Sequence, residues 1–362
     1  MNRFERQHIL SGFGVQKQAQ LRKARVLVIG AGGLGCPALL YLAAAGVGTL
    51  GIVDGDKVSL SNLNRQILFG FGDVDKPKAE TAGNYLKAQY PDININIHPE
   101  FLTVQNCFEI LVNYDLILDG SDNFPTRYLV SDASALLQKP VVMGAIYQNE
   151  GQVAVFDPSV APGISYRDLY PDPPHLNEIP NCNETGVLGV LPGIIGTLQA
   201  TEAIKHLTGF GQSLLNKMLF YNLLNHQVFE MAITSNPEAL LKKPKNFQEL
   251  MQTDYTWICG TVENVNWDEA ISKVKTDMAI LLDVREEHEL PKLENLPYIS
   301  IPYSQLEHVW KSLLTHDEVM IFCQSGIRSI KAATELQQKM PGKRIYSITG
   351  GILDADSPIN IY

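Results

Sequence analysis

The chain has 362 residues, enough for two or three domains of ordinary size. Hydrophobic residues make up 45% and charged residues 19%, a globular composition that excludes wholesale disorder and collagen-like repeats. Against 39 Asp and Glu stand 29 Lys and Arg, for a formal charge of −10. Such a chain has no overall attraction for nucleic-acid phosphates or anionic lipid, so we expect neither a nucleic acid nor a membrane as partner.

The five cysteines are scattered along the chain, and no two form a CxxC pair. This spacing excludes the usual cysteine-rich zinc ribbon and does not indicate a disulfide framework. The charged N-terminus lacks the apolar core of a signal peptide. The uncharged stretch 26–53 exceeds the length of about 20 residues that spans a bilayer. Its glycines and Pro37, however, divide it into strand, turn, helix and second strand, so we expect a cytoplasmic protein.

Apolar, β-branched segments alternate with longer helical patterns through about residue 155. This alternation predicts an α/β fold with an open, mostly parallel, doubly wound sheet. The pattern predicts a helix at 37–45 and strands at 25–29, 49–53, 93–98, 116–118 and 141–144.

The composition of the second half of the chain changes three times. Six prolines punctuate residues 157–185, a polar segment too long for an ordinary connection. An apolar run at 186–200 then leads into a helix ending near 207–209, and the polar stretch 234–254 is interpreted as an interdomain linker. A small α/β unit follows, with strands at 279–284, 319–322 and 344–348. We therefore predict domains at 1–245 and 246–362, the second including the linker.

A glycine-rich turn, Gly30-Ala31-Gly32-Gly33-Leu34-Gly35, follows the first strand and opens a helix. Glycines let the backbone approach phosphates, and the helix N-terminus supplies amide donors. Asp54 lies nineteen residues beyond Gly35, at the end of the next strand, where a carboxylate accepts bonds from ribose hydroxyls. Alone, this motif favours a nicotinamide or flavin enzyme.

The following segment points to a triphosphate instead. Asp56 leads into Ser61-Asn62-Leu63-Asn64-Arg65-Gln66, and Lys76 and Lys78 come soon after. One arginine and two lysines suit a reaction in which several phosphate oxygens must be neutralised as pyrophosphate leaves.

Two carboxylates, Asp119 and Asp122, follow the 116–118 strand. Ligands bind at the carboxyl ends of strands in such sheets, and an aspartate there suits magnesium. The alternative makes Asp122 and Asn123 a helix cap, and the two roles are compatible.

Cys323 follows an apolar strand and begins the turn Cys323-Gln324-Ser325-Gly326-Ile327-Arg328-Ser329 before a helix. Inward backbone N–H groups and the helix N-terminus favour a thiolate, and Arg328 adds a positive charge. Four residues separate Cys323 from Arg328, whereas cysteine phosphatases need five. The tighter loop resembles a rhodanese, and the segments at 281–286 and 349–352 agree with that resemblance. It implies that Cys323 carries sulfur as a persulfide.

Over roughly residues 3–235 the chain resembles the ThiF/MoeB/HesA family of ubiquitin-activating-type adenylating enzymes. The motifs that carry the resemblance are Gly30–Gly35, Asp54, Ser61–Arg65, Lys78 and Asp122-Asn123. The family implies ATP-dependent adenylation of the C-terminal glycine of a ubiquitin-like sulfur carrier that ends in Gly-Gly. The candidate nucleotide-binding residues are Gly30, Gly32, Gly33, Gly35, Asp54, Asp56, Ser61, Asn62, Asn64, Arg65, Lys78, Asp122 and Asn123.

The resemblance also assigns roles residue by residue. Asp54 would hold the ribose, Arg65 and Lys78 the phosphates, and Asp122 the magnesium ion. Arg6 matches an arginine that the family sends across a dimer interface into the neighbouring site, so a homodimer is implied. Cys182 resembles the crossover-loop cysteine that bonds covalently to the activated carrier in some members and is dispensable in others.

The chain departs from its family at two places. Many relatives bind a structural zinc through two CxxC pairs, but here Ser165 and Asp168 stand at the first pair, and no second pair occurs between residues 225 and 260. No zinc is therefore expected. The rhodanese half is shortened after Glu289, where residues 292–297 replace the usual stretch. This departure puts the speed of the sulfur step and its sulfur donor in question.

Together these features predict a bifunctional homodimer that uses ATP and Mg²⁺. Its first domain adenylates the carrier, and its rhodanese domain delivers persulfide sulfur to give a thiocarboxylate for molybdopterin, thiamine or tRNA thiolation. A cysteine desulfurase is an example of the sulfur donor. Three alternatives stay open: activation of a ubiquitin-like protein for conjugation, a regulator with an inactive rhodanese domain, and a nicotinamide-dependent oxidoreductase.

Overall fold

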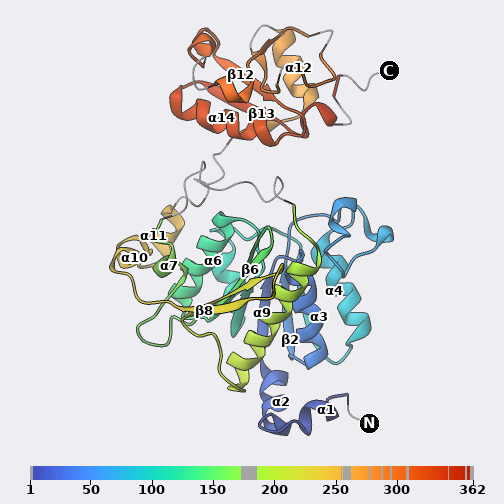
Figure 1. Cartoon of the computed structure of the whole chain (residues 1–362), viewed down its shortest axis with the longest axis vertical. Coiled ribbons are helices and arrows are strands. Elements are labelled where there is room, and N and C mark those ends of the chain that lie inside the picture. Colours follow the sequence, from blue (N-terminus) through green and yellow to red (C-terminus); the bar gives the residue numbers. More distant parts are fainter. Residues whose placement is uncertain are drawn as a thin grey trace. The chain divides into compact units, whose positions relative to one another are not determined.

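The computed structural model describes residues 3–172, 186–253, 255, 262–276, 279–286, 288–293, 296–306, 310–340, 342–354 and 357–358. The chain divides into two compact units, Met1–Ile258 and Cys259–Tyr362 (Figure 1). None of the described helices is both long enough and apolar enough to cross a membrane.

An eight-stranded sheet forms the centre of the first unit, in the order β3-β2-β1-β4-β5-β6-β7-β8. Its parallel half confirms the predicted doubly wound fold, with β1 at Arg25–Ile29, β2 at Thr49–Val53, β3 at Asn94–His98, β4 at Leu116–Asp119 and β5 at Val141–Tyr147. The other half is antiparallel and was not predicted: β6 at Glu150–Phe156, β7 at Lys217–Asn222 and β8 at Val228–Ala232.

Helices pack on both faces of this sheet because successive strand residues point to opposite sides. Val26 and Val28 of β1 belong to one buried cluster, together with helices α3 (Gly35–Ala45), α4 (Lys78–Gln89) and α9 (Val190–Thr208) (Figure 1). Leu27 and Ile29 belong to the opposite cluster, with α5 (Cys107–Leu111), α6 (Phe124–Leu137) and the short α7 (Tyr166–Leu169). The N-terminal helices are α1 (Glu5–His8) and α2 (Gly14–Lys23), and 3₁₀ turns lie at Leu60–Asn62 and Phe71–Asp73.

The interpretation of residues 234–254 as a linker is wrong. This stretch forms α10 (Pro237–Lys242) and α11 (Phe247–Gln252), which are capped by the side chains of Asn236 and Asn246. Leu250 is fully buried in the first unit, and the ring of Phe247 packs edge-on against Phe108 with 4.6 Å between centroids. The polar composition reflects the helix caps and the solvent-facing sides of two short amphipathic helices rather than a free connection.

The second unit has a parallel five-stranded sheet in the order β11-β10-β12-β13-β9. Its strands are β9 (Glu263–Val265), β10 (Ile280–Asp283), β11 (Tyr298–Ser300), β12 (Glu318–Phe322) and β13 (Arg344–Ile348). Its described helices are α12 (Trp267–Lys275) and α14 (Ile327–Lys339), with 3₁₀ turns at Tyr303–Gln305, Trp310–Thr315 and Gly351–Leu353. The predicted small α/β unit is thus present, and β12 runs directly into Cys323.

Candidate active sites

The glycine turn after β1 is shaped by contacts that only glycine permits. Gly30 has a φ of +88°, and a Cβ there would lie 3.0 Å from the carbonyl oxygen of Gly120. A Cβ on Gly35 would lie 1.8 Å from the carbonyl oxygen of Gly30. The turn therefore folds back on itself where α3 begins, and places the N-terminus of α3 beside the end of β4.

Asp54 braces this turn from the end of β2. Its Oδ2 accepts a hydrogen bond from the backbone N–H of Ala31 at 2.7 Å, and its Oδ1 accepts one from the N–H of Asp56 at 2.8 Å. Burial raises the pKa of Asp54, and these two backbone donors oppose that shift. An ionised carboxylate has about four acceptor positions, so Asp54 retains capacity for a further donor in the cleft.

Two of the three expected cations line the same cleft. The Nζ of Lys78 lies 2.9 Å from Oδ2 of Asp56, and the Lys78 side chain is 8% exposed. Arg65 donates to the carbonyl of Ser61 and to Oδ1 of Asn64, both at 3.1 Å. The expectation for Lys76 is wrong: its ammonium pairs with Asp73 on the surface, at 3.0 Å, and the side chain does not line the cleft.

The third cation of the cleft is Arg127, which the sequence analysis did not identify. This buried side chain projects from α6 and donates to the carbonyl oxygens of Ser121 at 3.1 Å and Gly144 at 3.3 Å. Its Nε lies 3.9 Å from a carboxylate oxygen of Asp119. No motif marks Arg127 in the sequence, because only the packing of α6 over the ends of β4 and β5 brings it to the site.

The two carboxylates after β4 have different surroundings. Asp119 is buried, and its Oδ1 accepts hydrogen bonds from the N–H and hydroxyl of Ser121 at 2.9 and 2.6 Å. Asp122 is exposed and lines the cleft. Asn123 caps α6 by accepting from the N–H of Thr126 at 2.9 Å. Capping and cleft-lining therefore coexist here, and only Asp122 presents its carboxylate to a ligand.

These groups surround an open cleft of about 1010 Å³. The candidate residues that line it are Gly30, Gly32, Gly33, Asp54, Asp56, Asn64, Arg65, Lys78, Asp122 and Asn123. Gly35, Ser61, Asn62 and Arg6 do not line it. Gly35 shapes the turn, the carbonyl of Ser61 holds Arg65, and Asn62 accepts from the N–H of Ser59 at 3.2 Å. Arg6 is exposed on α1, and Cys182 lies outside the described residues.

Asp168, at one of the family's zinc positions, is the centre of a polar cluster. Its Oδ2 accepts from the N–H of Ser165 at 2.8 Å and from Nζ of Lys243 at 2.5 Å, while Oδ1 accepts from the N–H of Asn236 at 3.0 Å. These bonds hold the pKa of Asp168 below its usual value. Across the described ranges, no three His, Cys, Asp or Glu side chains are grouped so that they could hold a metal ion. The ion pair between Asp168 and Lys243, which directly follows α10, ties α7 to the end of that helix.

Cys323 directly follows β12, at the start of a tight loop, and is 1% exposed. Its carbonyl accepts from the N–H of Ile352 at 2.8 Å, and its Sγ lies 3.7 Å from the hydroxyl oxygen of Ser329. Gly326, with a φ of +87°, turns the chain into α14. The loop is thus fixed at both ends, with the sulfur held inside it.

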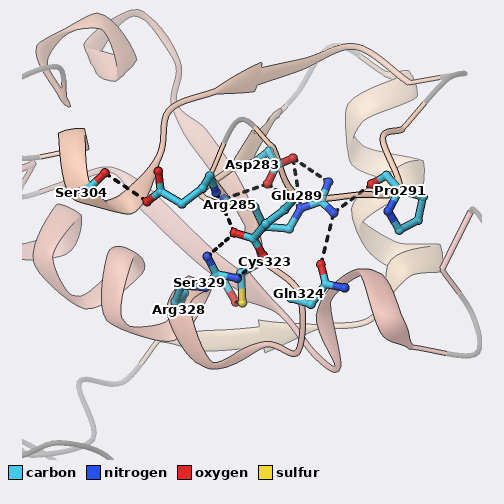
Figure 2. Close-up of polar contacts among 10 residues, drawn as sticks. Asp283, Arg285, Glu289, Pro291, Ser304, Cys323, Gln324, Arg328 and Ser329 are labelled. Atoms are coloured by element: carbon cyan, nitrogen blue, oxygen red, sulfur yellow. Dashed lines mark hydrogen bonds and ion pairs between the residues drawn. The ribbon is translucent and has the colours of Figure 1, made fainter. Parts of the chain in front are cut away.

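Arg328 does not offer a free positive charge to this loop. Its Nη1 and Nη2 lie 2.5 and 2.6 Å from the two carboxylate oxygens of Glu289 (Figure 2). The pair lowers the pKa of Glu289 to about 2 and raises that of Arg328. The positive charge expected from Arg328 is therefore present beside the loop, but a carboxylate 39 positions upstream is paired with it.

Cys36 and Cys107 are small buried side chains. Both are fully buried, and burial raises the pKa of their thiols, to about 12 for Cys36 and about 11 for Cys107. Neither is a thiolate at neutral pH, which leaves Cys323 as the loop cysteine among the described ones.

Comparison with known proteins gives a consistent result. Residues 4–242 match the ThiF family. The chain is 39% identical to the probable adenylyltransferase/sulfurtransferase MoeZ of Mycobacterium tuberculosis, over 97% of this chain and 91% of the relative. It is 46% identical to the sulfur carrier protein adenylyltransferase of Thermus thermophilus, over 72% of this chain and 97% of the relative.

A yeast relative gives the same pairing of names. The chain is 36% identical to the adenylyltransferase and sulfurtransferase UBA4 of Meyerozyma guilliermondii, over 97% of this chain and 86% of the relative. Among solved structures, E. coli MccB with ATP aligns with a TM-score of 0.58 and 20% identity, over 65% of this chain and 73% of that one. At that identity the likeness shows the shared fold.

Proposed function

Because the chain belongs to the ThiF family, we propose that its two units carry out successive steps on one substrate. The first adenylates the C-terminal glycine of a ubiquitin-like sulfur carrier, and the second supplies sulfur that converts the adenylate into a thiocarboxylate. The Thermus relative, named for the first step alone, covers little more than the first unit, whereas relatives named for both steps cover nearly the whole chain.

The observation that carries this proposal is the composition of the cleft. A glycine turn at a helix N-terminus, three cations and the exposed carboxylate that follows β4 converge there: Gly30, Arg65, Lys78, Arg127 and Asp122. In adenylation the carrier's carboxylate attacks the α-phosphorus of ATP and pyrophosphate leaves, so negative charge builds on several phosphate oxygens at once. Fixed cations that neutralise this charge stabilise the transition state. A dinucleotide hydride transfer has no such requirement.

The donor set also fits magnesium. Mg²⁺ is usually held by one or two carboxylates together with substrate phosphates, so it needs no group of three protein ligands. Asp122, exposed on the cleft, would hold the ion, which supplies charge neutralisation on the phosphates when bound. Asp54 would accept from the ribose hydroxyls while it continues to brace Ala31.

For the sulfur step, Cys323 would carry a persulfide inside its loop. The terminal persulfide sulfur attacks the acyl carbon of the adenylate, AMP leaves, and an acyl disulfide to Cys323 forms. A second thiolate then attacks the Cys323 sulfur, which releases the thiocarboxylate and leaves a disulfide. That thiolate comes from a cellular dithiol, whose other thiol then reduces the mixed disulfide and restores Cys323. Cys182 would form a transient covalent link to the activated carrier.

The remaining assignments are parts of the same proposal. The chain would act as a homodimer in which Arg6 reaches the neighbouring site, and its sulfur would come from a cysteine desulfurase. The thiocarboxylate would serve molybdopterin, thiamine or tRNA thiolation.

Exchange of pyrophosphate into ATP tests the first step. We expect exchange only when a carrier ending in Gly-Gly is added, and none with the same carrier lacking those two residues. Exchange without any carrier would overturn the proposal. If no carrier supports exchange, the result would favour the alternative in which the chain is a non-catalytic regulator. Mass analysis of the product separates sulfur transfer from conjugation, because an isopeptide adds a whole amine to the carrier.

A further inference from the structure

We propose that Glu289 is a specificity-determining residue of the Cys323 loop: by holding Arg328 it disfavours small dianionic sulfur donors. The inference rests on the proposed function of Cys323 as a sulfur acceptor. It extends that function by naming the residue that controls which class of donor is used efficiently.

The first observation is the geometry of the pair. Both guanidinium NH₂ groups of Arg328 donate to Glu289, one to each carboxylate oxygen. The two planar groups therefore meet edge to edge in a two-point contact. The backbone N–H of Glu286 donates to Oε1 of Glu289 at 2.8 Å and fixes the carboxylate in place. Since the pKa of Glu289 is lowered to about 2, the carboxylate stays charged at any ordinary pH.

The second observation is that the neighbouring guanidinium is also neutralised. Arg285 is fully buried and donates to both carboxylate oxygens of Asp283, with Nη2 to Oδ2 at 2.8 Å. Its Nη1 donates to the carbonyl of Pro291 at 2.8 Å and lies 3.4 Å from Oε1 of Gln324, beside the loop. The guanidinium of Arg285 is therefore paired with Asp283, and that of Arg328 with Glu289. Both carboxylates belong to the segment 283–291.

The third observation concerns a further carboxylate. Glu286 is half-buried, and its Oε1 accepts from the hydroxyl of Ser304 at 3.1 Å. It thus adds negative charge on the segment that carries Glu289. An incoming dianion would meet the backbone N–H groups of the loop but no unpaired guanidinium among the described loop contacts.

Thiosulfate is the dianionic probe for this inference. The Cys323 thiolate attacks its outer sulfur, a sulfur–sulfur bond to Cys323 forms, and the bond to the inner sulfur breaks as sulfite leaves with the electron pair. Cyanide then takes the outer sulfur as thiocyanate and restores the thiolate. A free guanidinium would stabilise bound thiosulfate, and Glu289 prevents this by occupying Arg328.

The test compares full-length wild type with Glu289→Gln in the thiosulfate–cyanide assay. We expect the KM for thiosulfate to fall about tenfold, with little change in kcat, because a cation is released near the donor site. The advantage of the variant should shrink as ionic strength rises, since exposed charge interactions are screened. Glu286→Gln is the matched control: it removes the same charge from the same segment, leaves the Glu289–Arg328 pair intact, and should change KM much less.

Several results would overturn the inference. An unchanged or raised KM in Glu289→Gln would show that Glu289 only supports the fold, and an equal fall in Glu286→Gln would show that the pair itself is irrelevant. Should Glu289→Gln misfold, Glu289→Asp retains the charge but not the two-point contact, and its KM should lie between wild type and the tenfold decrease. If the wild type forms no persulfide with any donor, the proposed function fails rather than the role of Glu289.

Discussion

Lys78 and Asp56 form an ion pair inside the nucleotide cleft, with Nζ and Oδ2 2.9 Å apart. The lysine is almost completely buried at the start of α4, whereas the aspartate side chain is 55% exposed. The carboxylate of Asp56 therefore holds the Lys78 ammonium in position at the wall of the cleft. Phosphate oxygens can compete for the same ammonium, so the cleft is preorganised for polyanions.

Replacing Lys78 tests this arrangement. Lys78→Met should lower carrier-dependent ATP–pyrophosphate exchange by roughly 100-fold, because one fixed cation is lost where charge develops. Lys76→Met is the control, since Lys76 pairs with Asp73 away from the cleft. Equal losses in the two variants would contradict the assignment of Lys78.

Gly35 is predicted to tolerate no side chain. In Gly35→Ala the added Cβ would lie 1.8 Å from the carbonyl oxygen of Gly30, so the turn must open and ATP binding should be lost. Gly193→Ala in α9 meets nothing within 4 Å and should bind ATP normally, with a helix stabilised by up to about 1 kcal/mol. Calorimetric titration with ATP and thermal unfolding would measure both. Normal ATP affinity in Gly35→Ala would contradict the structure of the turn.

The Asp168–Lys243 pair should control acid stability of the first unit. The folded pKa of Asp168 is lowered, so its stabilisation is complete above the unfolded value of about 3.9 and is lost as pH falls through the lower folded value. Asp168→Asn should destabilise the protein by about 3 kcal/mol at neutral pH, because it leaves the half-buried ammonium of Lys243 without its carboxylate.

Denaturant unfolding across pH measures this effect. The difference between wild type and Asp168→Asn should narrow below about pH 4. Glu230→Gln, which breaks an exposed pair with Lys217, should cost less than about 1 kcal/mol. A constant difference for Asp168→Asn down to pH 2 would show that its charge is not responsible.

Cys323 should be the described cysteine that takes up sulfur. Intact-protein mass spectrometry after exposure to a sulfur donor should show an added sulfur in wild type and in Cys107→Ala, but not in Cys323→Ala. Cys107 is the control because burial raises its pKa to about 11 and keeps the thiol protonated. Sulfur retained in full by Cys323→Ala would contradict the assignment.

The parallel half of the first sheet could be predicted because its signals are local. Buried strands such as 25–29 are apolar on both faces, and a glycine turn marks the first crossover. Strand β8 was missed because it lacks this pattern: all five of its residues are exposed. Strand β6 is largely buried, but it pairs antiparallel to β5, so no crossover helix separates the two strands. Helices α10 and α11 were taken for a linker since each buries few side chains.

The site residues divide in the same way, into those marked by a local sequence pattern and those brought together only by tertiary packing. Lys78 lies within a recognisable string of residues, and the structure places it in the cleft. Arg127 and Glu289 reach their sites through tertiary packing alone. Arg127 lies near the start of α6, and Glu289 lies in a segment 39 residues before Arg328. Lys76 was wrongly included because proximity in sequence does not reveal that Asp73 already binds it.

The central claim is that one chain both activates a carboxylate and sulfurates it. The most direct measurement mixes the full chain with ATP, Mg²⁺, a sulfur donor, a dithiol reductant and a carrier ending in Gly-Gly, and then weighs the carrier's C-terminal fragment. We predict a mass increase equal to replacing one oxygen by sulfur, dependent on ATP and absent in Cys323→Ala. An unchanged carrier with every donor, or an equal gain in Cys323→Ala, would contradict the account.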